Sequence, residues 1–495
     1  IASSKALKIS HCPCALEHLM SLSVFQTLVA VLAAVLVTAC GGGRGSSAPP
    51  PVGGLTLEAG EGGVTLTWTG VAGVDYWAYT GQTATLCKNC NNANDWYGHG
   101  VAGAQSRGWK PTISSPYFFT GNTFQTSLNN DVVYSFIMDG RINGGPGGEA
   151  TPSVSATPRL NGEHWYDNDS AFGSGNVKGL AFGPKLNTTN NTYDTTGAYL
   201  ALGSGGVKYS RTYDQITNRS AWTPITTTDT ANWKAVTYAF RDTNIQKFVG
   251  VGVSADRSQG AVVYSTDLVT FTTATLGAYD LNAVASSTNM VVAVGNHGTI
   301  YRSNDGVNWT VAASVPITTD LYAVTYATVA SGGLWVAVGA QGKVLYSADA
   351  SSWTEVNSGT TQDLKGVASM VNATYPNRVY SPLVTPTYSY AVVAVGQANS
   401  VPEGTLIRST DGTNWTRQAL GTRNLNAIVA SSALIPMNQF MVVGDGGTAF
   451  TSPDGVNWEP RTTTSSENLI GLVRGYHNQY LAWAANANGT TTYSK

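Results

Sequence analysis

The seven-residue stretch SNDGVNW, at residues 303–309, recurs in nearly the same form along the chain. STDGTNW (409–415) and SPDGVNW (452–458) match it well, and SADASSW (347–353) and STDLVTF (265–271) keep part of the pattern. An aspartate that accepts local backbone N–H bonds, a glycine at positive φ and an aromatic residue over the sheet edge suit a tight hairpin. Because the pattern repeats, we interpret its residues as structural. They are Asp267, Asp305, Asp349, Asp411 and Asp454, with Phe271, Trp309, Trp353, Trp415 and Trp458.

A second motif opens each repeat unit: Asp or Asn, an apolar residue, any residue, Ala or Gly, and an aliphatic residue. It begins at Asn176, Asn232, Asp280, Asp320, Asp363, Asn424 and Asn468. A second apolar segment follows, usually ending in Val-Gly, and the hairpin motif comes third. Four strands per unit and seven units predict an all-β, seven-bladed β-propeller over residues 159–495.

The seventh unit ends with TYSK (492–495), at its third strand, and no hairpin motif follows. We expect the missing outer strand to come from EHWYD (163–167), which precedes the first unit. Pairing of these N- and C-terminal strands would close the propeller and leave no free sheet edge.

The hairpin segments resemble Asp-box (BNR-type) repeats, in a form with one residue fewer between Asp and Trp, as in propellers similar to photosystem II assembly factors. The resemblance also raises a sialidase-like glycoside hydrolase, which would need an arginine triad, a Tyr/Glu pair and an acid Asp. Glu355 and Glu459 follow blade tryptophans on expected outer strands, and no Arg-Ile-Pro segment of the sialidase type occurs. A glycoside hydrolase is therefore kept only as an alternative.

An apolar run, VFQTLVAVLAAVLVTA at residues 24–39, is too short to span a bilayer and suits the core of a signal peptide. With Cys40 and three glycines after it, the run resembles a bacterial lipobox. The resemblance implies a signal peptide over residues 1–40, lipidation of Cys40, and a lipid-anchored place at the outer membrane or cell surface. An ordinary signal peptide with a coincidental cysteine is the alternative. Residues 41–52 (GGGRGSSAPPPV) form a flexible Gly/Ser/Pro linker.

Residues 53–158 show alternating strands, including VTLTW at 64–68, and resemble a fibronectin type III module. The resemblance places Trp68 in the core of a β-sandwich and Tyr134 at a tyrosine corner. Residues 80–123 depart from that family as a long insertion rich in Asn and aromatic residues. Cys87 and Cys90 lie in the insertion, and in an oxidising compartment we expect a short loop disulfide between them.

Composition excludes several functions. The chain has 27 Lys+Arg against 29 Asp+Glu, and its 11% of charged residues is well below the roughly 25% of an average domain. No basic patch for nucleic acid is expected. The histidines do not occur at metal-ligand spacing, and no G-x-S-x-G or phosphate-cradling loop occurs. We therefore predict no metal, no cofactor and no catalytic residues.

In a propeller, the segment leading into each inner strand and the turn after each second strand lie on one face, around the channel mouth. We call the residues on this face the rim. An acidic and amide rim could bind a polar ligand, a basic peptide or a cation, whereas the simpler interpretation is that each Asp or Asn caps its own turn. We predict a non-enzymatic binding or assembly scaffold for a surface protein or glycan. A structural subunit of a surface layer or filament, contacting through residues 80–123, is the other alternative. The candidate rim residues are Asp280, Asp320, Asp363, His297, Gln341 and Asp445.

Overall fold

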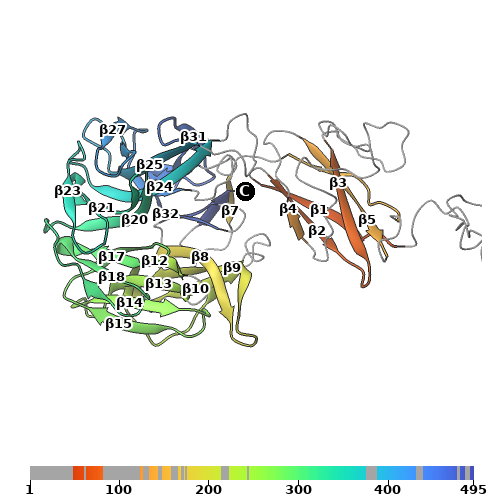
Figure 1. Cartoon of the computed structure of the whole chain (residues 1–495), viewed down its shortest axis with the longest axis horizontal. Helices are drawn as coiled ribbons and strands as arrows, with labels where there is room; N and C mark the ends of the chain where they lie inside the picture. Colours follow the sequence, from red (N-terminus) through yellow and green to blue (C-terminus); the bar gives the residue numbers. More distant parts are fainter. Residues whose placement is uncertain are drawn as a thin grey trace, which may run out of the picture. The chain divides into compact units, whose positions relative to one another are not determined.

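The computed structural model describes most of the chain from residue 48 onward (Figure 1). The described ranges are 48–60, 63–81, 123–125, 133–142, 148–157, 165–168, 172, 176–212, 222–241, 245–374, 387–430, 439–475, 480–484 and 491–494. Cys40, Cys87, Cys90 and nearly all of the expected insertion lie outside these ranges, so lipidation, disulfide and insertion stay predictions. Within them, no helix has the length and apolar character needed to cross a membrane.

Seven four-stranded antiparallel sheets confirm the predicted seven-bladed propeller (Figure 1). From the inner strand outward, blade 1 consists of β8 (Val177–Asn187), β9 (Thr192–Gly203), β10 (Lys208–Thr212) and β11 (Thr223–Pro224). Blade 2 consists of β12 (Asn232–Arg241), β13 (Ile245–Val253), β14 (Gly260–Ser265) and β15 (Thr272–Leu276). Blade 3 consists of β16 (Leu281–Ser286), β17 (Val291–Gly295), β18 (Ile300–Ser303) and β19 (Thr310–Val311). Blade 4 consists of β20 (Leu321–Val329), β21 (Gly332–Gly339), β22 (Val344–Ser347) and β23 (Thr354–Val356), and blade 5 of β24 (Leu364–Thr374), β25 (Thr387–Gly396), β26 (Thr405–Ser409) and β27 (Thr416–Ala419). Blade 6 consists of β28 (Leu425–Ala430), β29 (Phe440–Gly444), β30 (Thr448–Ser452) and β31 (Glu459–Thr462). Blade 7 consists of β32 (Leu469–Arg474), β33 (Tyr480–Ala484), β34 (Thr491–Ser494) and β7 (Trp165–Asn168).

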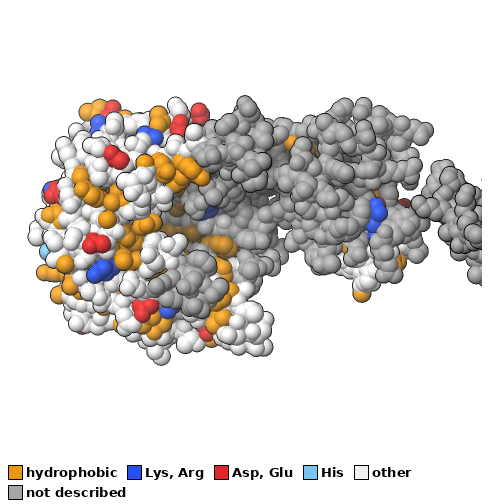
Figure 2. Space-filling model, in the orientation of Figure 1, with side chains coloured by type: hydrophobic (Ala, Val, Ile, Leu, Met, Phe, Trp, Pro, Cys, Tyr) orange, Lys and Arg blue, Asp and Glu red, His pale blue; other side chains and the backbone are white. Residues whose placement is uncertain are grey.

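The inner strands form a complete ring, because each contacts the inner strand of the next blade and β32 contacts β8. The hydrophobic core lies between blades. One cluster, for example, joins Val292 and Val294 of blade 3 to Leu321 and Trp335 of blade 4. Second strands are therefore covered on both faces, and every residue of β17 and β29 is buried. This packing explains the low charge of the chain, which Figure 2 shows as isolated charged side chains of both signs on one face.

Small residues of the repeat occupy places where two backbones approach closely. A Cβ on Gly179 would lie 2.7 Å from the Cα of Ala235 in the next inner strand, so the inner strands approach too closely at this motif position for a large side chain. A Cβ on Gly295, which ends a Val-Gly segment, would collide with the carbonyl oxygen of Asp280. The two small-residue signatures thus mark contacts between blades and within a blade.

The seventh blade is closed as the sequence predicted. β7 pairs antiparallel with β34, and Ser494 lies opposite Trp165. In blade 3, Arg302 lies opposite Thr310, so the next residues in register are Ser303 and Trp309. Trp165 therefore occupies the position of a hairpin tryptophan, supplied from before the first unit.

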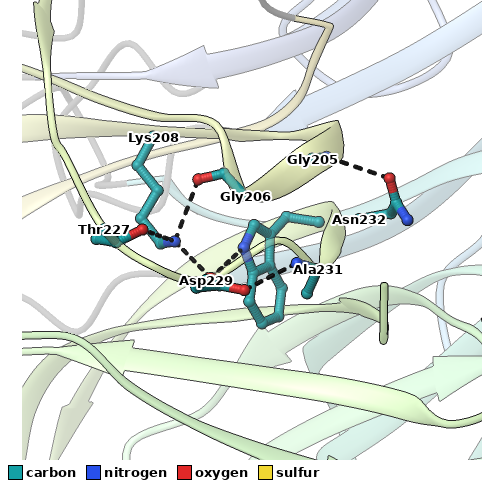
Figure 3. A network of polar contacts seen from close by, with 8 residues as sticks. Gly205, Gly206, Lys208, Thr227, Asp229, Ala231 and Asn232 are labelled. Carbon is teal, nitrogen blue, oxygen red and sulfur yellow. Dashed lines mark hydrogen bonds and ion pairs between the residues drawn. The ribbon is translucent and has the colours of Figure 1, made fainter. Parts of the chain in front are cut away.

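One network between blades 1 and 2 departs from the repeat (Figure 3). The ammonium of Lys208, whose side chain is fully buried, lies 2.5 Å from the carboxylate of Asp229 and also donates to the Thr227 hydroxyl. Asp229 accepts further hydrogen bonds from the Trp233 indole, at 2.9 Å, and from the Ala231 backbone, at 2.8 Å. A buried ion pair thus joins these two blades.

Between blades 3 and 4, the positions equivalent to Lys208, Asp229 and Trp233 are aliphatic. They are Ile300, Ile317 and Leu321, all buried in one hydrophobic cluster. The ion pair therefore lies where blades 3 and 4 have an apolar contact.

The N-terminal part contains two three-stranded sheets. One has the order β1 (Val52–Gly60), β2 (Gly63–Thr69), β4 (Thr123–Gln125), and the other β3 (Asp75–Gly81), β5 (Tyr134–Arg141), β6 (Val154–Ala156). Val64, Leu66 and Trp68 alternate along β2 and are buried, as expected for a strand with one apolar face. Trp68 meets Tyr76 of the other sheet edge-on, with ring centroids 6.4 Å apart.

Candidate functional site

The hairpin aspartates are used within their own turns. Asp305 accepts hydrogen bonds from the backbone N–H groups of Val307 and Asn308, at 2.8 and 2.7 Å, and from the Ser303 hydroxyl. Burial alone would raise the pKa of the Asp305 carboxyl, but these donors lower it to about 2. The other four hairpin aspartates make equivalent backbone hydrogen bonds, and their pKa values are also lowered.

Two of these turns lack glycine at the left-handed position. Gly306 has φ +72°, whereas Leu268 and Ala350 hold φ of 60° and 56° at the same place. A left-handed backbone costs roughly 1–2 kcal/mol in a residue with a Cβ, so the aspartate contacts must overcome this cost. The incomplete copies thus fold like the complete ones.

The rim contains a repeated short 3₁₀ turn after the second strand of a blade. Such turns occur at Ser204–Gly206, Asn296–Gly298, Ala340–Gly342 and Asp445–Gly447. The middle residue of each has positive φ. His297 and Gln341 occupy that place in blades 3 and 4, where blades 1 and 6 have Gly205 and Gly446.

In blades 2, 4, 5, 6 and 7 the side chain that opens the inner strand caps the turn of the preceding blade, which corrects the interpretation that it caps its own turn. Asp320 accepts from the backbone N–H of His297 at 3.0 Å, and Asp363 accepts from that of Gln341 at 3.0 Å. Asn232, Asn424 and Asn468 do the same with blades 1, 5 and 6. The backbone carbonyl of Asp320 meanwhile accepts from Ala340 in its own blade. Each such residue thus latches two blades together.

The rim carboxylates differ in how their charge is compensated. Asp280 pairs with Lys234 at 2.7 Å, and Asp363 pairs with Lys365 at 3.0 Å. Burial would raise the pKa of Asp363, but the Gln341 N–H and the Lys365 ammonium hold it below its usual value.

Asp445 accepts from the side-chain amides of Asn424 and Asn426, both at 2.8 Å. Asp320 differs from the other three: over the described part of the chain, no ion pair and no side-chain donor reaches its carboxylate, which accepts a hydrogen bond from the backbone N–H of His297. It is the rim carboxylate with uncompensated charge.

A ring of bulged residues was not recognised from the sequence. In all seven inner strands the register shifts around the third residue of the opening motif, the one described as any residue. Several reach a neighbouring blade: Asn282 donates to the Leu321 carbonyl, and the Lys365 ammonium lies 3.7 Å from the centre of the Tyr322 ring. The bulged residues are Lys178, Lys234, Asn282, Tyr322, Lys365, Asn426 and Ile470.

An exposed aromatic pair also escaped the sequence-based prediction. The rings of Tyr279 and His297 are stacked, with centroids 4.5 Å apart and 20° between their planes. Tyr279 is 45% exposed, and His297 is exposed as well. Tyr279 immediately precedes the opening motif of blade 3, which is the sequence signal that could have placed it on the rim.

Within the ranges described above, no three His, Cys, Asp or Glu side chains gather as a metal-ion site. Glu355 and Glu459 lie on the outer strands β23 and β31, and Glu355 pairs with Lys343 at 2.5 Å. The arrangement offers exposed polar and aromatic side chains for binding at the rim.

No protein-family model and no curated protein matches the sequence. Among solved structures, YCF48 from Cyanidioschyzon merolae is similar over 67% of this chain and 98% of that chain, with 12% identity and a TM-score of 0.43. The RRP9 WD40 repeats are similar over 67% of this chain and 96% of that chain, with 8% identity and a TM-score of 0.43. Similarity at this level of identity concerns the fold alone.

Proposed function

We propose that this protein is a non-enzymatic binding or assembly scaffold whose propeller rim takes a protein or glycan ligand. The observation that carries the proposal is that the repeated carboxylates accept hydrogen bonds from the protein's own backbone. The hairpin aspartates accept hydrogen bonds inside their own turns, and the opening Asp and Asn side chains latch neighbouring blades. Carboxylates bound in this repeated way are elements of the scaffold, so recognition falls to what differs between blades: the variable side chains, and a latch carboxylate that keeps one oxygen without a side-chain partner among the described residues.

The proposal includes export as a lipoprotein anchored through Cys40 at the outer membrane or cell surface, with residues 41–52 as a tether and an N-terminal fibronectin type III-like module. The strand orders β1-β2-β4 and β3-β5-β6 support such a module, because they are the A-B-E and C-F-G pairings of an immunoglobulin-like sandwich. The Ser-x-Asp turns likewise support the Asp-box type of hairpin. Mass spectrometry of the membrane-associated protein tests the anchor, which predicts a diacylglyceryl group on Cys40.

The function is tested with the full chain as bait on intact cells, beside a glycan array. We expect capture of a surface protein or retention of a glycan, and loss of binding when rim side chains of several blades are replaced together. The same preparations are assayed for glycoside hydrolysis. Turnover that a single carboxylate substitution abolishes, with the fold intact, would replace the scaffold by the glycosidase alternative.

A further inference from the structure

The rim is not chemically uniform, and its departures from the repeat gather in blades 3 and 4. Tyr279 and His297 present an exposed stacked pair beside blade 4. The backbone N–H of His297 donates to the Asp320 carboxylate, so the carboxylate is fixed at the turn that carries one ring of the pair. An aromatic surface and a negative charge are thereby fixed at one place.

The carboxylate in this group is the one whose charge the protein leaves uncompensated. The other rim carboxylates described above have ammonium or amide partners, whereas Asp320 has only a backbone N–H on one oxygen among the described residues. Its second oxygen is available to an external donor.

Among the four 3₁₀ turns of the rim, those of blades 3 and 4 place a residue with a Cβ at positive φ, as the longer turn of blade 2 does at Arg257. His297 and Gln341 both adopt φ of 56°, although Gly205 and Gly446 show that glycine serves at this turn position. Strained conformations of this kind are commonly retained at functional sites. The strain is therefore consistent with side chains that are kept for what they contact.

We propose that the group formed by Tyr279, His297 and Asp320, here called the blade-3/4 corner, binds an arginine side chain of a partner protein. This inference rests on the proposed binding function and deepens it by naming the chemistry of the partner. A guanidinium stacks flat on an aromatic ring and offers a fork of donors to a carboxylate. Such charge-assisted hydrogen bonds are about twice as strong as neutral ones. A protein ligand is favoured over a glycan because only a cation compensates Asp320.

The test uses the purified full chain and biotinylated peptides of alternating Gly and Ser with three spaced arginines, immobilised on a biosensor. A matched peptide carries citrulline, which keeps the planar shape without the charge. We expect the wild type to bind the arginine peptide at least about tenfold more tightly, since a hydrogen bond between charged groups contributes on this scale. Asp320→Asn keeps the acceptor for the His297 N–H and should remove the preference for arginine over citrulline.

Three further variants separate recognition from folding. Tyr279→Phe keeps the ring and should bind as the wild type does, whereas Tyr279→Leu should weaken binding severalfold. Asp256→Asn removes the same charge from an exposed turn of blade 2, where Asp256 is bonded to Ser254 and Ser258, and should leave binding unchanged. Equal binding of arginine and citrulline by the wild type, or an undiminished preference in Asp320→Asn, overturns the proposal.

Failure of this inference is distinguishable from failure of the proposed function. If the full chain captures a surface protein or glycan equally well with and without Asp320→Asn, the arginine site is wrong and the scaffold function stands. If neither form binds any surface protein or glycan, both are wrong.

Discussion

Replacing Asp229 by alanine removes the carboxylate that faces the buried Lys208 ammonium. The Lys208 side chain has no exposed surface, and Asp229 has 14%, so the variant leaves a charge without its counter-ion in the interior. It also leaves the Trp233 indole N–H and the Ala231 backbone N–H without their acceptor. Breaking a buried ion pair by removing one partner typically costs about 3–5 kcal/mol of the free energy of unfolding.

The matched control is Glu355→Ala. The Lys343–Glu355 pair has the same 2.5 Å separation but is 31% and 36% exposed, so its loss should cost less than about 1 kcal/mol. Thermal unfolding of the full chain, followed by circular dichroism, compares the two variants. An unfolding entropy of about 2.1 cal/mol/K per residue, over a propeller of roughly 330 residues, converts the expected loss for Asp229→Ala into a Tm decrease of about 4–7 °C. Glu355→Ala should lower the Tm by no more than about 1–2 °C.

A compensating variant tests the cause. Lys208→Ile, Asp229→Ile and Trp233→Leu together reproduce the aliphatic trio found between blades 3 and 4. Replacing a buried ion pair by well-packed apolar residues is often neutral or stabilising, so the triple variant should recover most of the lost stability. The reasoning is refuted if Asp229→Ala destabilises no more than Glu355→Ala.

Three shorter predictions follow. The pKa of Asp305 is about 2 in the folded protein and about 3.9 in the unfolded chain, so the ionised carboxylate stabilises the fold above about pH 4, and this contribution is lost as the pH falls towards 2. Asp305→Asn should therefore make the free energy of unfolding depend less on pH in that window. An unchanged pH dependence in an acid titration would contradict this. Trp165→Ala should cost about 3–5 kcal/mol in chemical unfolding, because the side chain is 5% exposed in the closing strand, and a loss below 1 kcal/mol would exclude that closure as a source of stability. Gln341→Gly should stabilise the propeller by up to about 1 kcal/mol in the same assay, since it relieves a left-handed backbone, and destabilisation would show that the side chain holds the turn.

The repeat made the propeller predictable because each of its signatures has a local physical cause. The Val-Gly endings mark a contact with a carbonyl of the same blade, and the Ala or Gly of the opening motif marks the approach of the next inner strand. Even the closing strand at Trp165 followed from counting strands per unit. These contacts form within one unit or between adjacent units, so a comparison of the repeat units of this one chain is enough to detect their signatures.

The rim was predictable as a place but not as chemistry. The bulge in each inner strand is a shift of register, which exists only once two strands are paired. In the sequence, the bulged residue is visible only as the variable third position of the opening motif. The latches join residues of different blades, such as His297 to Asp320, and nothing in either unit alone indicates the contact. Lys208 could be recognised in the sequence as an exception, because an alignment of the third strands gives it the same position as Ile300. That Asp229 is its partner becomes evident only in three dimensions.

In a repeat protein, equivalent positions of the blades can be compared, and this comparison separates structural residues from functional ones. Where blades repeat one contact, as in the latch bond to the preceding turn, a substitution would break a contact that other blades also make, so that bond belongs to the ring. Where one blade departs at a buried position, as at Lys208, the departure is compensated inside the protein by Asp229. At the blade-3/4 corner the exceptions reach the surface: His297 and Tyr279 are exposed, and the half-buried latch residue Asp320 has no side-chain partner for its charge among the described residues. This contrast between a compensated buried exception and an uncompensated one at the surface is the reason for our proposal that a ligand binds at the corner, and the arginine peptide tests it directly.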